Sequence, residues 1–159
     1  MSQLKELINN LGYNILFKTG LFSDVMIKNA DAAKILLYHS VNPKETVFTN
    51  GLKVTVTPEK FEKQLLYLNS EYNIISLNRL LSLLQQGGDI SNKIVLTFDD
   101  GFMDNYIHAF PILKKYHLPA TIFLPGESIN DKEILWVHKF QAIINSVPKE
   151  QIIKEINNM

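Results

Sequence analysis

The chain has 159 residues, of which 46% are hydrophobic and 20% charged, a composition that suits one globular domain with a buried core. Its 16 basic and 16 acidic side chains cancel to a formal net charge of zero, so the charge balance indicates neither a nucleic acid nor an anionic membrane as partner. The absence of cysteine excludes a disulfide framework and a thiolate metal site.

The sequence shows neither a membrane-spanning segment nor a convincing signal peptide. No stretch approaches the ~20 consecutive apolar residues that a membrane-spanning helix needs. Near the N-terminus, Lys5 and Glu6 are followed by the polar Asn9 and Asn10 instead of the apolar centre of a signal peptide. We therefore expect a cytoplasmic protein.

The chain divides into a short preface and a main domain. Leu4, Ile8 and Leu11 recur at helical spacing, which predicts a short amphipathic helix near the N-terminus. We expect residues 1–33 to form this helical preface and residues 34–159 to form the domain.

The domain alternates predicted strands and helices. Short apolar runs predict strands at 35–38, 72–75, 94–98 and 120–124, and helical patterns extend over 131–146 and 149–156. Thr57 is a favourable N-cap with Pro58 at the first helical position, and Ser76 can cap the next helix. A further helix is expected over Asn105–Tyr116, with a kink or a restarted turn at Pro111, because proline lacks an N–H donor. This alternation favours a parallel sheet or barrel.

The stretch Ile94–Gly101 reads as a buried strand that ends at two adjacent carboxylates, Asp99 and Asp100. Functional residues gather at the carboxyl ends of parallel strands. A divalent cation could bind one carboxylate and acidify a bound water, which leaves the other carboxylate free to act as a general base. The alternative is a plain surface turn, because Asp-Asp-Gly is also a common turn composition.

A histidine, His39, follows the first predicted strand at its carboxyl end. One interpretation is a histidine held by local hydrogen bonds. The other places it at the mouth of a site, close to a metal or to substrate. We keep both interpretations open.

Several motifs together resemble the polysaccharide deacetylase family, also called the NodB-homology domain. The resemblance covers about residues 34–126. The matching segments are Leu36–Val41 with its Tyr-His pair, Val56–Phe61 with Gln64 and Leu65, Thr97–Phe102 with the Thr-Phe-Asp-Asp-Gly motif, Phe110–Tyr116, and Pro119–Leu124.

The resemblance implies a fold, a reaction and roles for individual residues. The fold would be α/β, a distorted seven- or eight-stranded (β/α) barrel of which this chain supplies roughly the N-terminal half. The reaction would be metal-dependent removal of N-acetyl groups from amino sugars in a glycan, with zinc as the expected metal. Asp99 would be the general base, Asp100 the metal-binding aspartate and the backbone N–H of Phe102 an oxyanion donor, with His39 and Tyr38 at the substrate rim.

One part of the family pattern has no counterpart in this sequence. The family takes two metal-binding histidines from a later His-Ser/Thr-x-x-His motif, whereas this chain has histidines only at positions 39, 108, 117 and 138. The alternative hypotheses are therefore a catalytically incomplete carbohydrate-binding module and a fragment that depends on a partner chain. Exposed sheet edges would then favour self-association.

Overall fold

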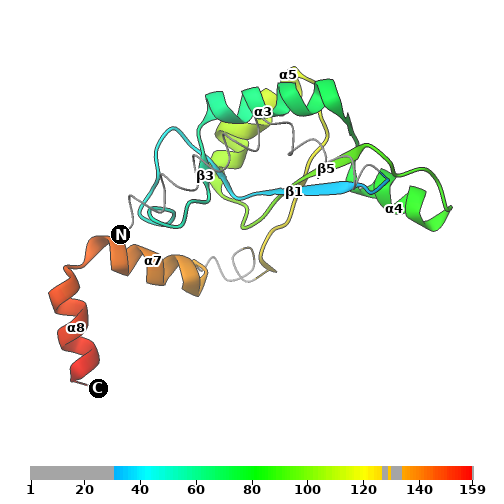
Figure 1. Ribbon diagram of the computed structural model, residues 1–159. Coiled ribbons are helices and arrows are strands. Elements are labelled where there is room, and N and C mark those ends of the chain that lie inside the picture. The colour runs from blue at the N-terminus through cyan, green and yellow to red at the C-terminus, as the bar shows by residue number, and fades with distance from the viewer. Residues whose placement is uncertain (1–30, 127–128, 130–133, 159) are drawn as a thin grey trace, which may run out of the picture.

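The computed structural model describes residues 31–126, residue 129 and residues 134–158 (Figure 1). The helical preface predicted for residues 1–33 lies almost wholly outside the described residues. Within the described part of the chain, no helix is long and apolar enough to cross a membrane.

A parallel sheet forms the centre of the described chain (Figure 1). Its middle strand, β5 (Lys93–Phe98), pairs with β1 (Lys34–Tyr38) along one edge. On the opposite edge, β4 (Asn73–Ile74) pairs with the beginning of β5, and β6 (Thr121–Ile122) pairs with its end. Strands at all four predicted places are confirmed, although two of them are shorter than predicted.

The central strand is buried on both of its faces. Every residue from Ile94 to Phe98 is at most 3% exposed. Such a strand has no solvent-facing side and therefore reads as a continuous apolar run instead of an alternating one. The polar residues that follow it are the first side chains of this segment that can meet solvent.

Two helices begin at the predicted caps. The Thr57 hydroxyl accepts a hydrogen bond from the Lys60 N–H at 3.4 Å at the start of α3 (Pro58–Glu71). The Ser76 hydroxyl accepts one from the Arg79 N–H at 3.2 Å at the start of α4 (Leu77–Gln85). These hydroxyls satisfy N–H groups that have no partner inside the helix.

Proline divides the next helix into two parts. A π-helical turn, η1 (Asn105–Ala109), leads directly into α5 (Phe110–Lys115), and Pro111 lies in the first turn of α5. The Phe110 N–H donates to the Asn105 carbonyl, five residues back, which is the wider spacing of a π-helix. The expected restart at Pro111 is confirmed.

The core lies between the sheet and the helices α3 and α5, which cover the same face in Figure 1. Three aromatic rings form its centre. Phe61 lies edge-on to Tyr38 with ring centres 5.1 Å apart and to Phe98 with ring centres 5.9 Å apart. Leu65 and Leu113 extend this cluster from the two helices.

A second small sheet was not predicted. β2 (Ser40–Val41) pairs in parallel with β3 (Thr55–Val56), and neither lies in one of the four ranges predicted to be strands. Strands of two residues are too short to show a periodic pattern. The loop between β2 and β3 is closed by this pairing.

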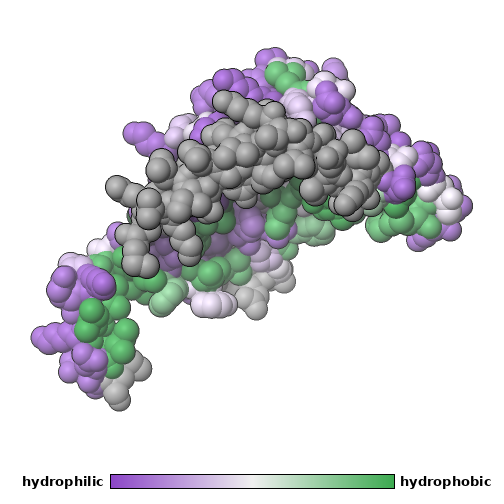
Figure 2. Space-filling model, viewed as in Figure 1, coloured by the Kyte–Doolittle hydropathy of each residue, from purple (hydrophilic) through white to green (hydrophobic). Residues whose placement is uncertain are grey.

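Two helices follow β6 along the chain. α7 (Trp136–Ser146) and α8 (Lys149–Asn157) lie in the two ranges predicted to be helical. The first prediction began too early, because residues 134 and 135 are not helical, and residues 131–133 lie outside the described residues. Both helices carry exposed hydrophobic side chains, and Figure 2 shows hydrophobic atoms along them at the surface.

The described strands form a four-stranded and a two-stranded parallel sheet. The mixed α/β class with parallel strands is therefore confirmed. Closure into a barrel is not seen within residues 31–126 and 134–158, and it stays a prediction. The face of β1 that carries Ile35 and Leu37 is open, since these side chains are 57% and 53% exposed.

The aromatic cluster gives a direct test of this fold. Phe61→Ala should lower the free energy of unfolding by about 3–5 kcal/mol, because a fully buried ring is replaced by a cavity. Urea denaturation followed by circular dichroism measures the change. Leu66→Ala, on the exposed side of the same helix, is the control and should change stability by no more than about 0.5 kcal/mol. Equal effects of the two substitutions would contradict this description of the core.

Candidate active site

The chain reverses direction immediately after the central strand. Asp100 has a φ of 68° and Gly101 a φ of 61°, so two consecutive residues adopt the left-handed conformation. Glycine adopts it without steric cost, and aspartate is among the side chains that tolerate it best. A Cβ at position 101 would also collide with the side chain of Leu124. The turn therefore favours glycine at position 101.

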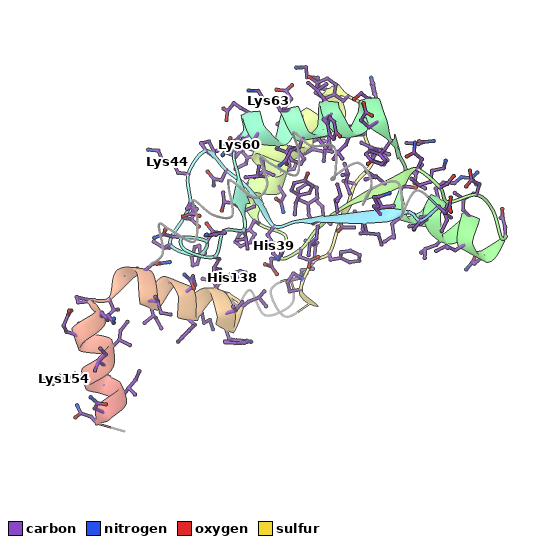
Figure 3. All side chains as sticks on the ribbon, in the orientation of Figure 1. His39, Lys44, Lys60, Lys63, His138 and Lys154 are labelled. Atoms are coloured by element: carbon purple, nitrogen blue, oxygen red, sulfur yellow. The ribbon has the colours of Figure 1, made fainter. Side chains whose placement is uncertain are left out.

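Asp99 and His39 lie at the same end of the sheet, directly after the carboxyl ends of β5 and β1. The Asp99 N–H donates to the Tyr38 carbonyl at 3.0 Å, which continues the pairing of β5 with β1 by one residue. His39 is the residue that follows Tyr38 (Figure 3). The parallel register thus brings the two ends of β1 and β5 together. Asp99 is half-buried, and its carboxylate accepts no hydrogen bond within the described part of the chain.

The two predicted rim residues have different surroundings. His39 lines a shallow hollow of ≈ 230 Å³ whose other polar walls include Lys53 and Gln64. The Tyr38 ring packs in the aromatic core instead, and its hydroxyl donates to the Gln64 Oε1 at 3.2 Å. Burial raises the pKa of the Tyr38 hydroxyl above its usual value. Tyr38 therefore acts first as a packing residue beside the hollow.

A histidine from a distant helix lies beside Asp100. His138 of α7 places its Nε2 at 3.5 Å from the Asp100 Oδ2, and the two side chains are 12% and 25% exposed. Neither ring nitrogen of His138 has a hydrogen-bond partner among the described residues. The imidazole ring packs 4.9 Å from the Phe102 ring and 6.5 Å from the Phe48 ring. Sequence reasoning missed this pairing.

The two side chains share a cavity of ≈ 250 Å³. It is lined by Phe48, Asp100, Gly101, Phe102, Ile134, Leu135 and His138. Its walls are mainly apolar, and the only ionisable side chains among these lining residues are one carboxylate and one imidazole. Such a combination can orient a polar group within a mainly apolar pocket.

Amide hydrogen bonds attach α7 to the loop between β2 and β3. The Gln141 Nε2 donates to the Asn50 carbonyl at 2.7 Å. The Asn145 Nδ2 donates to the carbonyls of Val47 at 2.9 Å and Asn50 at 3.1 Å. These contacts hold the helix that carries His138 against the loop that carries Phe48.

A third aspartate, Asp104, is buried and structural. Its carboxylate accepts hydrogen bonds from the Ser40 hydroxyl at 2.7 Å, the Val41 N–H at 3.2 Å and the Asn42 Nδ2 at 3.5 Å. The side chain ties β2 to the helix that follows the Asp99–Asp100 turn. Asp104 follows the turn at Gly101 by three residues, and nothing in the sequence around it predicts that it is buried.

The family resemblance implies a metal ion, and the described residues supply only part of a ligand set for it. No group of three His, Cys, Asp or Glu side chains within the described residues is placed to hold an ion. Asp100 and His138 nevertheless present one carboxylate oxygen and one imidazole nitrogen, which are ligands that zinc accepts. This donor pair fits two positions of a metal site, and the described residues supply no third.

Known proteins resemble the chain in sequence. Residues 86–159 match the family model described as polysaccharide deacetylase. Bacillus subtilis YxkH, named as a candidate polysaccharide deacetylase, is 39% identical over 113 residues, which cover 69% of this chain and 38% of YxkH. The poly-beta-1,6-N-acetyl-D-glucosamine N-deacetylase of Staphylococcus epidermidis is 31% identical over 59% of this chain and 36% of its own length. The chain thus spans less than two-fifths of these curated relatives.

Solved structures resemble the described fold. The structure of IcaB from Ammonifex degensii superimposes with a TM-score of 0.52 at 28% identity, over 59% of this chain and 38% of that one. The Streptococcus pyogenes deacetylase PplD gives a TM-score of 0.51 at 31% identity, over 58% of this chain and 42% of that one. The chain is therefore a relative of the polysaccharide deacetylases, as its Thr97–Phe102 motif predicted.

Proposed function

We propose that this chain contributes to a metal-dependent hydrolase that removes N-acetyl groups from the amino sugars of a polysaccharide or glycan. One observation carries the proposal. Asp99 and Asp100 leave the central parallel strand side by side, within the segment that matches the deacetylase family. A relative whose name specifies N-deacetylation of poly-beta-1,6-N-acetyl-D-glucosamine supports the substrate class.

Asp99 is the proposed general base. Its carboxylate is half-buried and accepts no hydrogen bond within the described residues, so its lone pairs remain available for a proton. A base must lie within hydrogen-bond reach of the proton that it removes. At the open end of the sheet, Asp99 can receive a proton from a water molecule that attacks the acetamido carbonyl.

Asp100 is the proposed metal-binding aspartate. It would hold a divalent cation, with zinc as the expected ion, whose chemistry is to polarise a carbonyl and to lower the pKa of a bound water. Asp100 adopts the left-handed backbone conformation, whereas Asp99 does not. The two consecutive aspartates therefore differ in backbone conformation, which is consistent with different roles.

The backbone after the turn is the proposed oxyanion donor. The Phe102 N–H has no acceptor within the described residues, and it follows directly after the Asp100–Gly101 turn. Preorganised N–H donors stabilise the negative charge that develops on a carbonyl oxygen during acyl transfer. The hollow beside His39, with Lys53 and Gln64 in its walls, is the proposed contact region for sugar hydroxyl groups.

A second candidate function is supported by the incomplete donor set and the open strand edge. No three metal-ligating side chains come together within the described part of the chain. β1 has β5 as its only strand neighbour there. We therefore also propose a catalytically incomplete domain that binds carbohydrate or that works only with a partner chain.

The proposed roles of Asp99 and Asp100 can be distinguished by substituting each aspartate and measuring acetate release and zinc content. In a domain completed with the histidine ligands that this chain lacks, Asp99→Asn should reduce acetate release from an acetylated chito-oligosaccharide by about 10²–10⁴-fold while zinc content is kept, because only the base is lost. Asp100→Asn should reduce both acetate release and zinc content. The measurements are acetate release and metal content by mass spectrometry.

Asp31→Asn, an exposed carboxylate far from the turn in sequence, is the control and should change neither quantity. Equal loss of zinc in the Asp99 and Asp100 variants would contradict the assignment of roles. Absence of acetate release in the unaltered chain, with retained glycan binding, would favour the second candidate function.

The turn itself can be tested through backbone strain. Gly101→Ala should lower the free energy of unfolding by about 1–2 kcal/mol, because a Cβ disfavours the left-handed conformation. It should also lower acetate release, since Phe102 and both aspartates would shift. Gly126→Ala is the control, because an added Cβ there meets no neighbouring atom. A Gly101→Ala variant with unchanged stability and activity would rule out this requirement.

The second candidate function predicts association through the open β1 face. Leu37→Lys should shift the chain from oligomer toward monomer, because an exposed lysine disfavours contact at a strand edge. Light scattering at several protein concentrations measures the change. Leu66→Lys introduces the same charge at an exposed position on α3 and should leave the association unchanged. A chain that is monomeric at all concentrations would contradict this prediction.

A further inference from the structure

A groove between α5 and β6 contains a buried amide without a hydrogen-bond partner. The groove has a volume of ≈ 360 Å³, and its walls are mainly apolar, with Phe98, Leu113 and Ile122 among them. Asn105 also lines it and is 2% exposed. Neither the Nδ2 nor the Oδ1 of Asn105 has a hydrogen-bond partner within the described residues. Native structures rarely leave such a group unpaired, so the groove has the features of a surface that another segment covers.

The outer edge of β6 borders this groove. Within the described part of the chain, β6 pairs only with β5. The Phe123 N–H donates to the Phe98 carbonyl at 2.8 Å, so the N–H of Phe123 points toward β5. Successive residues of a strand direct their N–H and C=O groups to opposite sides, and those of Ile122 therefore face away from β5. An edge of this kind pairs readily with a further strand.

The chain carries a second open strand edge, on β1. Among the described strands, β1 also pairs only with β5. The Tyr38 carbonyl accepts the hydrogen bond of the Asp99 N–H and therefore faces β5. The backbone groups of Leu37, one residue earlier, face away from β5, and its side chain is 53% exposed. Each copy of the chain thus has both an edge beside a groove and an apolar strand with an edge of its own.

We propose that β1 of one copy of this chain docks as an added strand along β6 of a second copy, over the groove between α5 and β6. The backbone of the added strand then supplies hydrogen-bond partners for Ile122 and for the Asn105 amide, and the Leu37 side chain is removed from water. A contact between β1 and β1 of two copies would leave Ile122 and Asn105 unpaired. The inference rests on the second candidate function, which predicts self-association through β1, and it names the surface that β1 meets.

Three lysine substitutions test the two edges with the same change of charge. Ile122→Lys places the charge at the groove, at a side chain that is 45% exposed, and Leu37→Lys places it on β1. A lysine at a strand edge opposes pairing with a further strand. We expect both variants to lose the association of the unaltered chain, as measured by light scattering at several protein concentrations. Leu66→Lys, at a 47% exposed position on α3, is the matched control and should keep it.

Mixing the variants shows whether the contact joins two different surfaces. The Leu37→Lys variant keeps an intact groove, and the Ile122→Lys variant keeps an intact β1. A contact between different surfaces is therefore restored in the mixture, which should associate although neither variant does so alone. The control mixture combines the Leu37→Lys variant with a variant that carries both substitutions. It contains no intact β1 and should stay monomeric.

Asn105→Leu tests the buried amide with a side chain of the same branched shape. It removes both unpaired polar atoms, so the free energy of unfolding of the monomer should not fall. Association should weaken by roughly 5–100-fold, because backbone groups of the added strand lose their partner. Urea denaturation at a concentration where the chain is monomeric measures the stability, and light scattering measures the association. A purely structural role for Asn105 predicts the reverse, with lower stability and unchanged association.

The outcomes separate this inference from the second candidate function. Loss of association in the Leu37→Lys variant, with full association of the Ile122→Lys variant, overturns docking at β6 while association through β1 stands. A mixture that stays monomeric overturns the docking as well, as does unchanged association of Asn105→Leu. An unaltered chain that is monomeric at all concentrations overturns both. Restored association in the mixture, with each variant folded by circular dichroism, supports the inference whether or not acetate is released.

Discussion

The parallel pairing around β5 is the constraint on which the rest of the described structure depends. β1 occupies one edge of β5, and the Asp99 N–H extends that pairing to the Tyr38 carbonyl. On the other edge, the Phe123 N–H donates to the Phe98 carbonyl at 2.8 Å. Because the strand is buried on both faces, its polar residues can emerge only at its end. The position of the candidate site follows from this pairing.

The buried side chain of Asp104 links the segment after β5 to β2. It accepts hydrogen bonds from Ser40 and Val41 of β2, while its own backbone enters the helix that follows the turn. A buried anion needs such partners, since an unpaired charge in the interior is costly. The bonds hold β2, and the loop after it, in a defined position beside the turn. The fold thus positions both walls of the cavity around Asp100.

Local signals predicted most of the fold, whereas contacts between distant segments were out of reach. The Thr57 cap, the restart at Pro111 and the buried run before Asp99 each depend on a few adjacent residues, and each is confirmed. β2 and β3 are too short to show a period. The pairing of His138 with Asp100 depends on where a later helix docks, and no spacing rule within the sequence encodes that position.

The docking of α7 and the binding of a ligand in the cavity beside Asp100 are thermodynamically linked. Solvent-exposed hydrogen bonds from the side-chain amides of Gln141 and Asn145 attach α7 to the loop between β2 and β3. Exposed polar contacts contribute modestly to stability, so local opening of this helix requires little free energy compared with the aromatic core. A ligand that binds both Asp100 and His138 would bind only the docked form, and it would therefore stabilise docking by a free energy that grows with the logarithm of one plus the ratio of its concentration to its dissociation constant. The occupancy of the site and the closure of its wall are then two aspects of one equilibrium.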